Sequence, residues 1–243
     1  MRRFFAELPD ASAGTLVTLP VDESLHASRT LRLRPGERVG LLDGRGVSVA
    51  ATLVGTGGRV AAEITGPLPS AEPRLRVTLW QGLPKLDKLE RIIQKSTELG
   101  ARRIIPTLFG RCDVRVFPAE RVTRGNRVAR ESSKQCGRAW CPPVEPLASF
   151  DECVARVGGG GAAAYLLWER ASEPFAECFA KRPPGMDRAI IIVGPEGGIS
   201  DEEAERLQGA GALAVSLGPR ILRTETAPIA ALALMFGLSG DLG

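Results

Sequence analysis

Short apolar runs separated by turn residues fill the first 70 or so positions of the chain. The runs at residues 16–19, 38–42, 47–53 and 60–64 are typical of strands, and Pro35-Gly36, Asp43-Gly44 and Gly57-Gly58 separate them. An Asp-Gly pair between two apolar runs is a strong hairpin signal. One helix is expected, over residues 23–33. So many short strands in so short a stretch predict a small β-barrel.

The pattern changes after a cluster of prolines, Pro67, Pro69 and Pro73, which is typical of a linker. Beyond it, short apolar runs alternate with longer segments of helical character. We expect strands at residues 75–80, 103–108, 163–168, 188–193 and 213–217, and helices at 86–99, 118–136, 174–180, from 200 onward and at 224–238. Such alternation predicts a parallel sheet covered by helices. The predicted fold class is α/β, with a barrel domain at residues 1–72 and a sheet domain at residues 73–243.

Local signals refine these elements. Ser200 followed by Glu203 forms a capping box, which marks the start of a helix. The near-continuous apolar character of residues 188–193 is typical of a buried parallel strand. Gly125 is expected to interrupt the helix at 118–136, and the four glycines at 158–161 are expected to form a flexible connection without regular structure around it.

Composition and charge add a candidate partner. The 243 residues are 44% hydrophobic and 25% charged, which is the balance of a folded globule. The net charge of +4 is unevenly distributed, because residues 73–140 hold 16 basic and 6 acidic side chains. So basic a segment favours a polyanionic partner such as nucleic acid. A simpler alternative is that a chain with only 5 Lys among its 32 basic residues scatters arginine over any surface.

Several classes of function are excluded by what the sequence lacks. The single histidine, His26, rules out a Ser-His-Asp hydrolase and disfavours zinc, and alone it fits an ordinary packed histidine. No P-loop or dinucleotide-binding glycine motif is present. No apolar stretch is long enough for a membrane span, and residues 1–7 do not resemble a signal peptide. With five scattered cysteines, we expect a cytoplasmic protein with reduced thiols, no metal and no membrane.

Three loops follow the last predicted strands, at the edge where open α/β sheets bind ligands. The first loop begins Leu167-Trp168-Glu169-Arg170, the second covers residues 193–200, and the third covers residues 217–228. The second loop, Gly194-Pro195-Glu196-Gly197-Gly198, surrounds a carboxylate with glycine just before a helix, which suits a polar ligand but also fits an ordinary turn. The third loop combines two arginines, an acid and two threonines, a density of polar groups that indicates function.

These two loops resemble the signature loops of the RsmE family, the ribosomal RNA uracil-N3 methyltransferases of the SPOUT superfamily. The matching strings are Val193-Gly194-Pro195-Glu196-Gly197-Gly198-Ile199-Ser200 and Leu217-Gly218-Pro219-Arg220-Ile221-Leu222-Arg223-Thr224-Glu225-Thr226-Ala227. The resemblance continues in Met1-Arg2-Arg3-Phe4-Phe5, in His26 with residues 30–37, in residues 85–100 and in residues 131–138. Thr30 stands where a valine is usual, and Trp168-Glu169 where the family often has His-Pro-Glu. The motifs occur in family order and run through the whole chain.

The resemblance implies a PUA-like barrel followed by a SPOUT domain with a trefoil knot, assembled as a homodimer. It implies S-adenosylmethionine as cofactor, held by the backbone of the three loops. The cofactor-binding residues carried over by motif position are Leu167, Gly194, Glu196, Gly197, Leu217, Gly218, Ile221, Leu222, Arg223 and Thr226. Methyl transfer to uracil N3 needs alignment of the attacking nitrogen and removal of its proton. Glu196 and Glu225 are candidates for the proton transfer, and Arg223 for stabilising negative charge on the base; Glu225 also fits a helix N-terminal acid.

The implied substrate is small-subunit ribosomal RNA in assembled subunits, with the target uridine unstacked. The expected RNA-binding residues are Arg2, Arg3, His26, Arg29 and Arg32, together with the basic segment 73–140. Two alternatives stay open from the residues themselves. One is a non-catalytic RNA-binding or assembly factor, which would leave the glycine-rich loops unexplained. The other is a SPOUT methyltransferase that acts on transfer RNA or on another ribosomal site; the match through residues 1–36 favours the uracil-N3 family.

Overall fold

A computed structural model describes residues 1–55 and 59–242 of the chain, and the expected turn at Gly57-Gly58 lies outside these residues. The described chain forms two compact units. The first unit contains residues 1–72 and residues 130–141, and the second contains residues 73–129 together with the described residues from Pro142 onward. The helix α3 (Ala119–Cys136) contributes its beginning to the second unit and its end, from Arg130, to the first.

The first unit is a curled five-stranded sheet with strand order β1-β3-β4-β5-β2. Its elements are β1 (Arg2–Phe5), β2 (Leu16–Thr18), α1 (Val21–Leu25), a π-helical turn η1 (His26–Thr30), β3 (Arg38–Leu42), β4 (Ser48–Gly55) and β5 (Ala61–Pro67). Register shifts between Ala50 and Ala51 and between Leu53 and Gly55 interrupt the β4–β5 ladder, and bulges of this kind help a sheet to curl. Phe4, Val39 and Leu41 are fully buried in its core.

The sequence pattern located β2 to β5 but missed β1, a strand of only four residues that pairs in parallel with β3. The expected helix over residues 23–33 differs as well. The helical segment begins at Val21 and changes to π-helical geometry at His26, and it ends at Thr30. A π-turn shifts the phase of the side chains, so the 3.6-residue period fails to describe its end.

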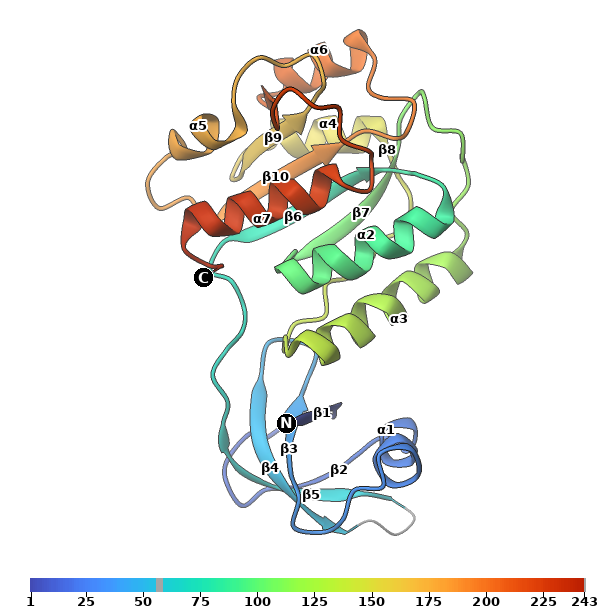
Figure 1. Ribbon diagram of the computed structural model, residues 1–243, viewed down its shortest axis with the longest axis vertical. Coiled ribbons are helices and arrows are strands. Elements are labelled where there is room, and N and C mark those ends of the chain that lie inside the picture. Colours follow the sequence, from blue (N-terminus) through green and yellow to red (C-terminus); the bar gives the residue numbers. More distant parts are fainter. Residues whose placement is uncertain (56–58, 243) are drawn as a thin grey trace. The chain divides into compact units, whose positions relative to one another are not determined.

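The second unit is a six-stranded parallel sheet with strand order β11-β9-β10-β6-β7-β8 (Figure 1). Its strands are β6 (Arg76–Gly82), β7 (Arg103–Leu108), β8 (Ala148–Ser149), β9 (Ala163–Leu167), β10 (Arg188–Val193) and β11 (Leu213–Val215). Besides α3, its helices are α2 (Leu86–Leu99), α4 (Phe150–Gly158), α5 (Phe175–Ala180), α6 (Asp201–Gly209) and α7 (Ala227–Ser239). The predicted parallel α/β sheet is confirmed. Residues 188–193 form β10 between β9 and β6, with Ala189 to Val193 buried, as their apolar run predicted.

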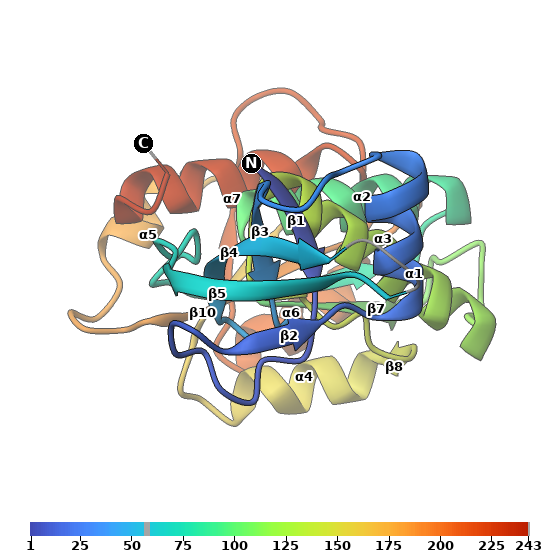
Figure 2. The same cartoon turned by 90° about the horizontal axis from the view of Figure 1, so that it is seen from below.

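Helices cover both faces of this sheet. In Figure 2, which looks at the sheet edge-on, α2 and α7 lie on one side and α4 lies on the other. The helices α2 and α7 pack against each other, as α4 does against α6. Parallel strands place their carboxyl ends at one edge, so the loops after β9, β10 and β11 meet there.

Three local expectations in this unit were wrong. Gly125 does not interrupt α3; a Cβ there would lie 3.0 Å from Val144 and 3.2 Å from Ile93, so glycine serves close packing. The first of the four glycines at 158–161 ends a regular helix, α4, and Gly159 is its C-cap; the helix begins at a capping box formed by Ser149 and Glu152. The last helix begins at Ala227, because residues 224–226 form a turn before it.

Candidate active site

An open cavity of about 850 Å³ lies at the carboxyl edge of the parallel sheet, between the three predicted loops. Apolar side chains such as Leu167, Val193 and Leu222 line part of it. Backbone of two glycine-rich segments lines the rest, and Gly218 has a φ of +103° with open space where a Cβ would stand. A cavity with apolar walls and a few polar groups has the character and the size of a small-molecule site.

Most of the expected cofactor-binding residues line this cavity. They are Leu167, Gly194, Glu196, Gly197, Leu217, Gly218, Ile221, Leu222 and Arg223. Thr226 is not among its lining residues and occupies the N-cap position of α7. Trp168, which the sequence analysis quoted without a role, lines the cavity too, and its indole N–H is buried with no hydrogen-bond acceptor among the described residues.

The second loop is fixed by its close approach to β6. A Cβ on Gly82 would stand 2.5 Å from the backbone nitrogen of Pro195 and 2.7 Å from the carbonyl carbon of Gly194. Real side chains do not tolerate such distances to backbone atoms, so residue 82 has to be glycine for the loop to take this position. The sequence pattern gave no sign of this requirement, because it involves residues more than 100 positions apart.

A buried hydrogen-bond chain joins the third loop to the second. The Thr224 hydroxyl donates to the carbonyl oxygen of Gly194 at 2.7 Å and accepts from Nε2 of Gln81 at 3.0 Å. Gln81 is fully buried in β6, and its Nε2 also donates to the carbonyl of Gly82 at 3.1 Å. Buried polar side chains that are bonded to several elements fix those elements in one arrangement. Gln81 and Thr224 therefore position two of the three cavity walls.

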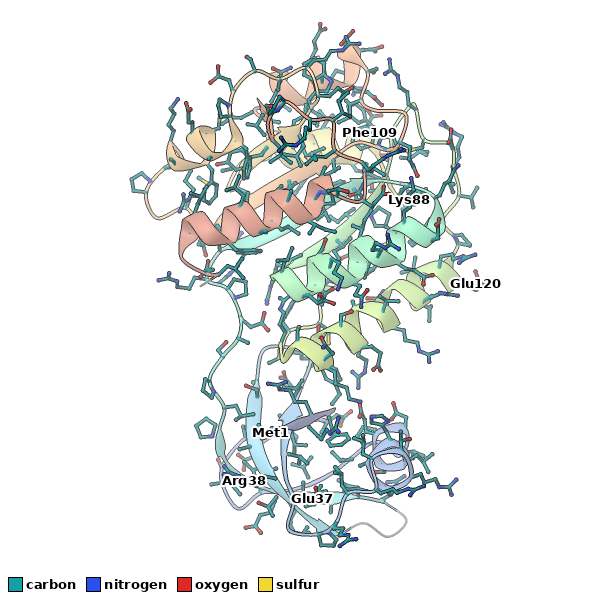
Figure 3. The ribbon with its side chains drawn as sticks, in the orientation of Figure 1. Met1, Glu37, Arg38, Lys88, Phe109 and Glu120 are labelled. Carbon is teal, nitrogen blue, oxygen red and sulfur yellow. The ribbon has the colours of Figure 1, made fainter. Side chains whose placement is uncertain are left out.

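Lys88 is the functional-site residue that sequence reasoning missed, although its helix carried a family motif. Its ammonium, in the first turn of α2, lies 3.1 Å from Oε1 of Glu196 and 3.6 Å from Oε2 of Glu225. The backbone N–H of Lys85 also donates to Oε1 of Glu196, at 3.2 Å. Figure 3 labels Lys88 in the first turn of α2. The two carboxylates proposed for proton transfer thus share one cation.

The contacts within this cluster shift the pKa values of Glu196 and Lys88. Burial alone would raise the pKa of Glu196, but the N–H of Lys85 and the ammonium of Lys88 hold that pKa below its usual range. The hydrogen bond to Glu196 raises the pKa of Lys88 above its usual range, against the opposing effect of desolvation. Glu196 and Lys88 therefore stay charged at neutral pH. Oε2 of Glu225 is buried and accepts no hydrogen bond from the described residues.

The expected RNA-binding residues lie in the first unit. Arg2 and Arg3 are on β1, His26 and Arg29 are on η1, and Arg32 follows it with a φ of +51°. The rings of His26 and Phe4 meet edge to face at 6.3 Å, which brings η1 beside β1. The guanidinium of Arg3 packs against Gly137, because a Cβ on Gly137 would lie 2.6 Å from Cζ of Arg3. The side chains of Arg2, Arg29 and Arg32 are exposed.

Several basic residues of the segment 73–140 are engaged in ion pairs. Lys134 binds the buried carboxylate of Glu23 at 2.7 Å, and Arg138, itself 3% exposed, binds Glu72 at 2.7 Å. Arg124 pairs with Glu90 and Arg103 with Glu145. Part of the positive charge of residues 73–140 is therefore neutralised within the protein and is not available to a partner. The residues that remain exposed, including those of the loop after β7, are the ones available to a polyanion.

The five cysteines are free thiols, and burial raises the pKa of Cys153 to about 12. Among residues 1–55 and 59–242, no three His, Cys, Asp or Glu side chains are grouped so as to hold a metal ion. Over the same residues, no helix has the length and apolar character needed to cross a membrane.

Comparison with known proteins identifies the family of this chain. The family model of the RNA methyltransferase domain matches residues 71–236. Ribosomal RNA small subunit methyltransferase E of Mycobacterium bovis is 37% identical over 234 residues, covering 93% of this chain and 87% of the relative. The crystal structure of ribosomal RNA small subunit methyltransferase E from Neisseria gonorrhoeae, bound to S-adenosyl methionine, matches with a TM-score of 0.87 and 34% identity, covering 98% of both chains. A putative methyltransferase from Legionella pneumophila, in complex with the same cofactor, matches with a TM-score of 0.83 and 29% identity over 97% of this chain and 96% of that one.

The parallel sheet and the cavity between its last three loops thus define the class, an RNA methyltransferase. Within that class, the chain belongs to the family of ribosomal RNA small subunit methyltransferase E. The expected fold class, an α/β SPOUT parallel-sheet domain preceded by a small PUA-like β-barrel, is confirmed, and the barrel is a curled five-stranded sheet.

Proposed function

We propose that the protein transfers the methyl group of S-adenosylmethionine to N3 of a uridine in 16S ribosomal RNA. The observation that carries the proposal is the cavity itself, because its walls are the two glycine-rich loops and the loop after β9. Relatives with the same fold over nearly their whole length are bound to S-adenosylmethionine or named as small-subunit methyltransferases.

The residues of the cavity suit this cofactor. Apolar side chains from β9, β10 and β11 offer a slot for a purine ring, and the unpaired indole N–H of Trp168 offers a donor at the wall. Backbone groups around Gly194, Gly218 and Leu222 can bind its polar edges without side chains in the way. When bound, S-adenosylmethionine supplies an activated methyl group.

The chain's own contribution is alignment and handling of charge. Uracil N3 carries a proton that has to leave as the methyl group arrives. Of the two candidate acceptors, only Glu196 is among the residues that line the cavity, and its Oε1 is bound by Lys85 and Lys88. Glu225 is not among the lining residues, and its Oε2 is buried 3.6 Å from the Lys88 ammonium, so we favour Glu196 as the proton acceptor. Arg223, exposed at the cavity wall, stabilises negative charge on the base.

The first unit binds the RNA around the target. Arg2, Arg29 and Arg32 present exposed guanidinium groups, and Arg3 and His26 lie beside them on β1 and η1. Contacts between arginine and phosphate make affinity fall steeply with salt. Because the small ribosomal subunit is assembled in the bacterial cytoplasm, we place the protein there.

A second copy of the chain completes the assembly in this proposal. The helix α7 is apolar along its whole length and leaves Leu234 and Leu238 exposed, and Ile221 of the third loop is 85% exposed. Large apolar side chains exposed on α7 and on the third loop favour a protein partner, and a homodimer is the simplest one. Sedimentation equilibrium is expected to give twice the chain mass.

Transfer of labelled methyl groups tests the function. Small ribosomal subunits that lack the modification, naked 16S RNA and transfer RNA are offered in parallel with labelled S-adenosylmethionine. We expect label in the assembled subunits, mapped to N3 of a uridine. Label in transfer RNA alone would move the substrate to the alternative class. Cofactor binding without transfer to any of the three would contradict the proposed function.

A further inference from the structure

We propose that the loop after β7, residues 109–118, forms the RNA-facing rim of the cavity and that Arg111 binds a backbone phosphate beside the target nucleotide. The inference rests on the proposed function, because it names how that site holds its substrate. It starts from the position of the loop. β7 is parallel to β6, which neighbours β10, so the end of β7 lies at the same sheet edge as the three cavity loops.

The loop is packed directly against the cavity wall. A Cβ on Gly197 would stand 2.7 Å from the carbonyl oxygen of Arg111 and 2.9 Å from its Cβ. One guanidinium nitrogen of Arg111 lies 3.5 Å from the carbonyl oxygen of Gly197. Gly197 lines the cavity, so no side chain separates Arg111 from that wall.

The base of the loop is rigid. Phe109 is fully buried and packs on the ring of Phe150 at 5.3 Å (Figure 3 labels Phe109). The backbone N–H of Gly110 donates to Oε1 of Glu203 at 2.7 Å, and Glu203 is itself only 9% exposed. The buried thiol of Cys112 accepts from the N–H of Phe109 at 3.3 Å. These three contacts fix the first residues of the loop. The exposed charge of Arg111 is therefore preorganised for a ligand.

The charge of the loop suits phosphate. Arg111 and Arg115 are exposed, and Arg115 contacts the carbonyl oxygen of Gly110 at 3.4 Å, so both cations stay near the wall. The hydrogen bond of the Arg111 guanidinium to the Gly197 carbonyl is a long one, which leaves most of its five donors for a ligand. A carboxylate oxygen of Glu169 and a guanidinium nitrogen of Arg111 lie near the same point, 3.2 Å and 4.0 Å from where a Cβ on Gly198 would stand.

The test compares Arg111→Ala with Arg188→Ala. Arg188 is an exposed arginine at the amino end of β10, at the opposite edge of the same sheet. Its replacement removes the same positive charge, but at a position away from the cavity. For Arg111→Ala we expect about a tenfold rise in KM for the ribosomal RNA substrate, with an unchanged Kd for S-adenosylmethionine. The slope of log affinity against log salt should fall by about 1. Arg111→Lys should recover part of the affinity, since it restores the charge without the planar fork.

The outcomes separate this inference from the proposed function. Wild-type protein that methylates no RNA overturns the function itself. Wild-type activity with equal KM and salt slope in Arg111→Ala and Arg188→Ala overturns the rim assignment alone. A weaker cofactor Kd in Arg111→Ala also overturns it, because the residue would then act on the cavity wall rather than on RNA.

Discussion

The ammonium of Lys88 lies 3.1 Å from Oε1 of Glu196, and this contact joins the first turn of α2 to the second loop of the cavity. The same ammonium lies 3.6 Å from Glu225, just before α7. Side chains from three separate segments therefore meet in one charged cluster beside the cavity. Without the cation, two carboxylates would face each other across the joined loops, and like charges at short range repel.

Replacement of Lys88 by methionine is expected to weaken cofactor binding about tenfold, because repulsion between Glu196 and Glu225 displaces the loop that lines the cavity. Isothermal titration with S-adenosylmethionine measures the change. Lys95→Met is the matched control, since Lys95 pairs with Glu98 at 2.8 Å on the same helix but away from the cavity. Equal losses in the two variants would show that Lys88 has no particular role at the site.

The stability of the wild-type protein should fall more steeply with acid than the stability of Glu196→Gln, which lacks this carboxylate. The pKa of Glu196 is held below its ordinary 4.5, so its stabilising contribution is complete above about pH 4.5 and is lost as pH falls through the lowered value. In Glu196→Gln that part of the pH dependence disappears. Solvent screens this partly exposed pair, so the difference in unfolding free energy is about 0.5 kcal/mol.

Urea unfolding at several acidic pH values measures this difference. Asp241, whose pKa is also lowered, provides residual acid sensitivity in both proteins. Parallel stability curves for wild type and Glu196→Gln down to the lowest pH would mean that Glu196 is not stabilised by its partners.

The sequence was sufficient for the elements with a strong period and for the position of the cavity. α2, β7 and β10 have the predicted bounds because helical period or continuous apolar character defines both ends. The three loops meet as expected, because loops that follow neighbouring parallel strands share an edge. α4 was not predicted although Ser149 and Glu152 form a capping box, because it is short and runs directly into a stretch of glycines typical of a loop.

Contacts between distant positions were beyond sequence reasoning. Gln81 lies within an apolar strand, and nothing local indicates that it bonds Thr224, 143 positions later. The motif around Lys88 was recognised, but its pairing with Glu196 depends on how the parallel sheet brings α2 to the second loop. Such contacts follow from tertiary packing, which no local period encodes.

Arg223→Ala should lower turnover at least about 100-fold while cofactor affinity changes little, because the guanidinium is exposed at the wall and acts on charge that develops during transfer. Single-turnover rates with saturating cofactor and ribosomal substrate measure the effect on chemistry. Arg156→Ala, an exposed arginine in the last turn of α4, controls for the loss of one positive charge. A normal single-turnover rate in Arg223→Ala would remove this residue from the mechanism.

Gly82→Ala tests how closely β6 supports the cavity. The new methyl group would stand 2.5 Å from the backbone nitrogen of Pro195, so either the second loop moves or the strand does. We expect a loss of about 3 kcal/mol in unfolding free energy and a cofactor affinity too weak to measure by titration. Gly209→Ala is the control, because a Cβ at the end of α6 meets nothing within 4 Å. Its expected change is below about 1 kcal/mol and in the stabilising direction, since alanine favours helix over glycine. Equal stability of the two variants would mean that the second loop adapts freely, and the argument that Gly82 fixes the cavity would fail.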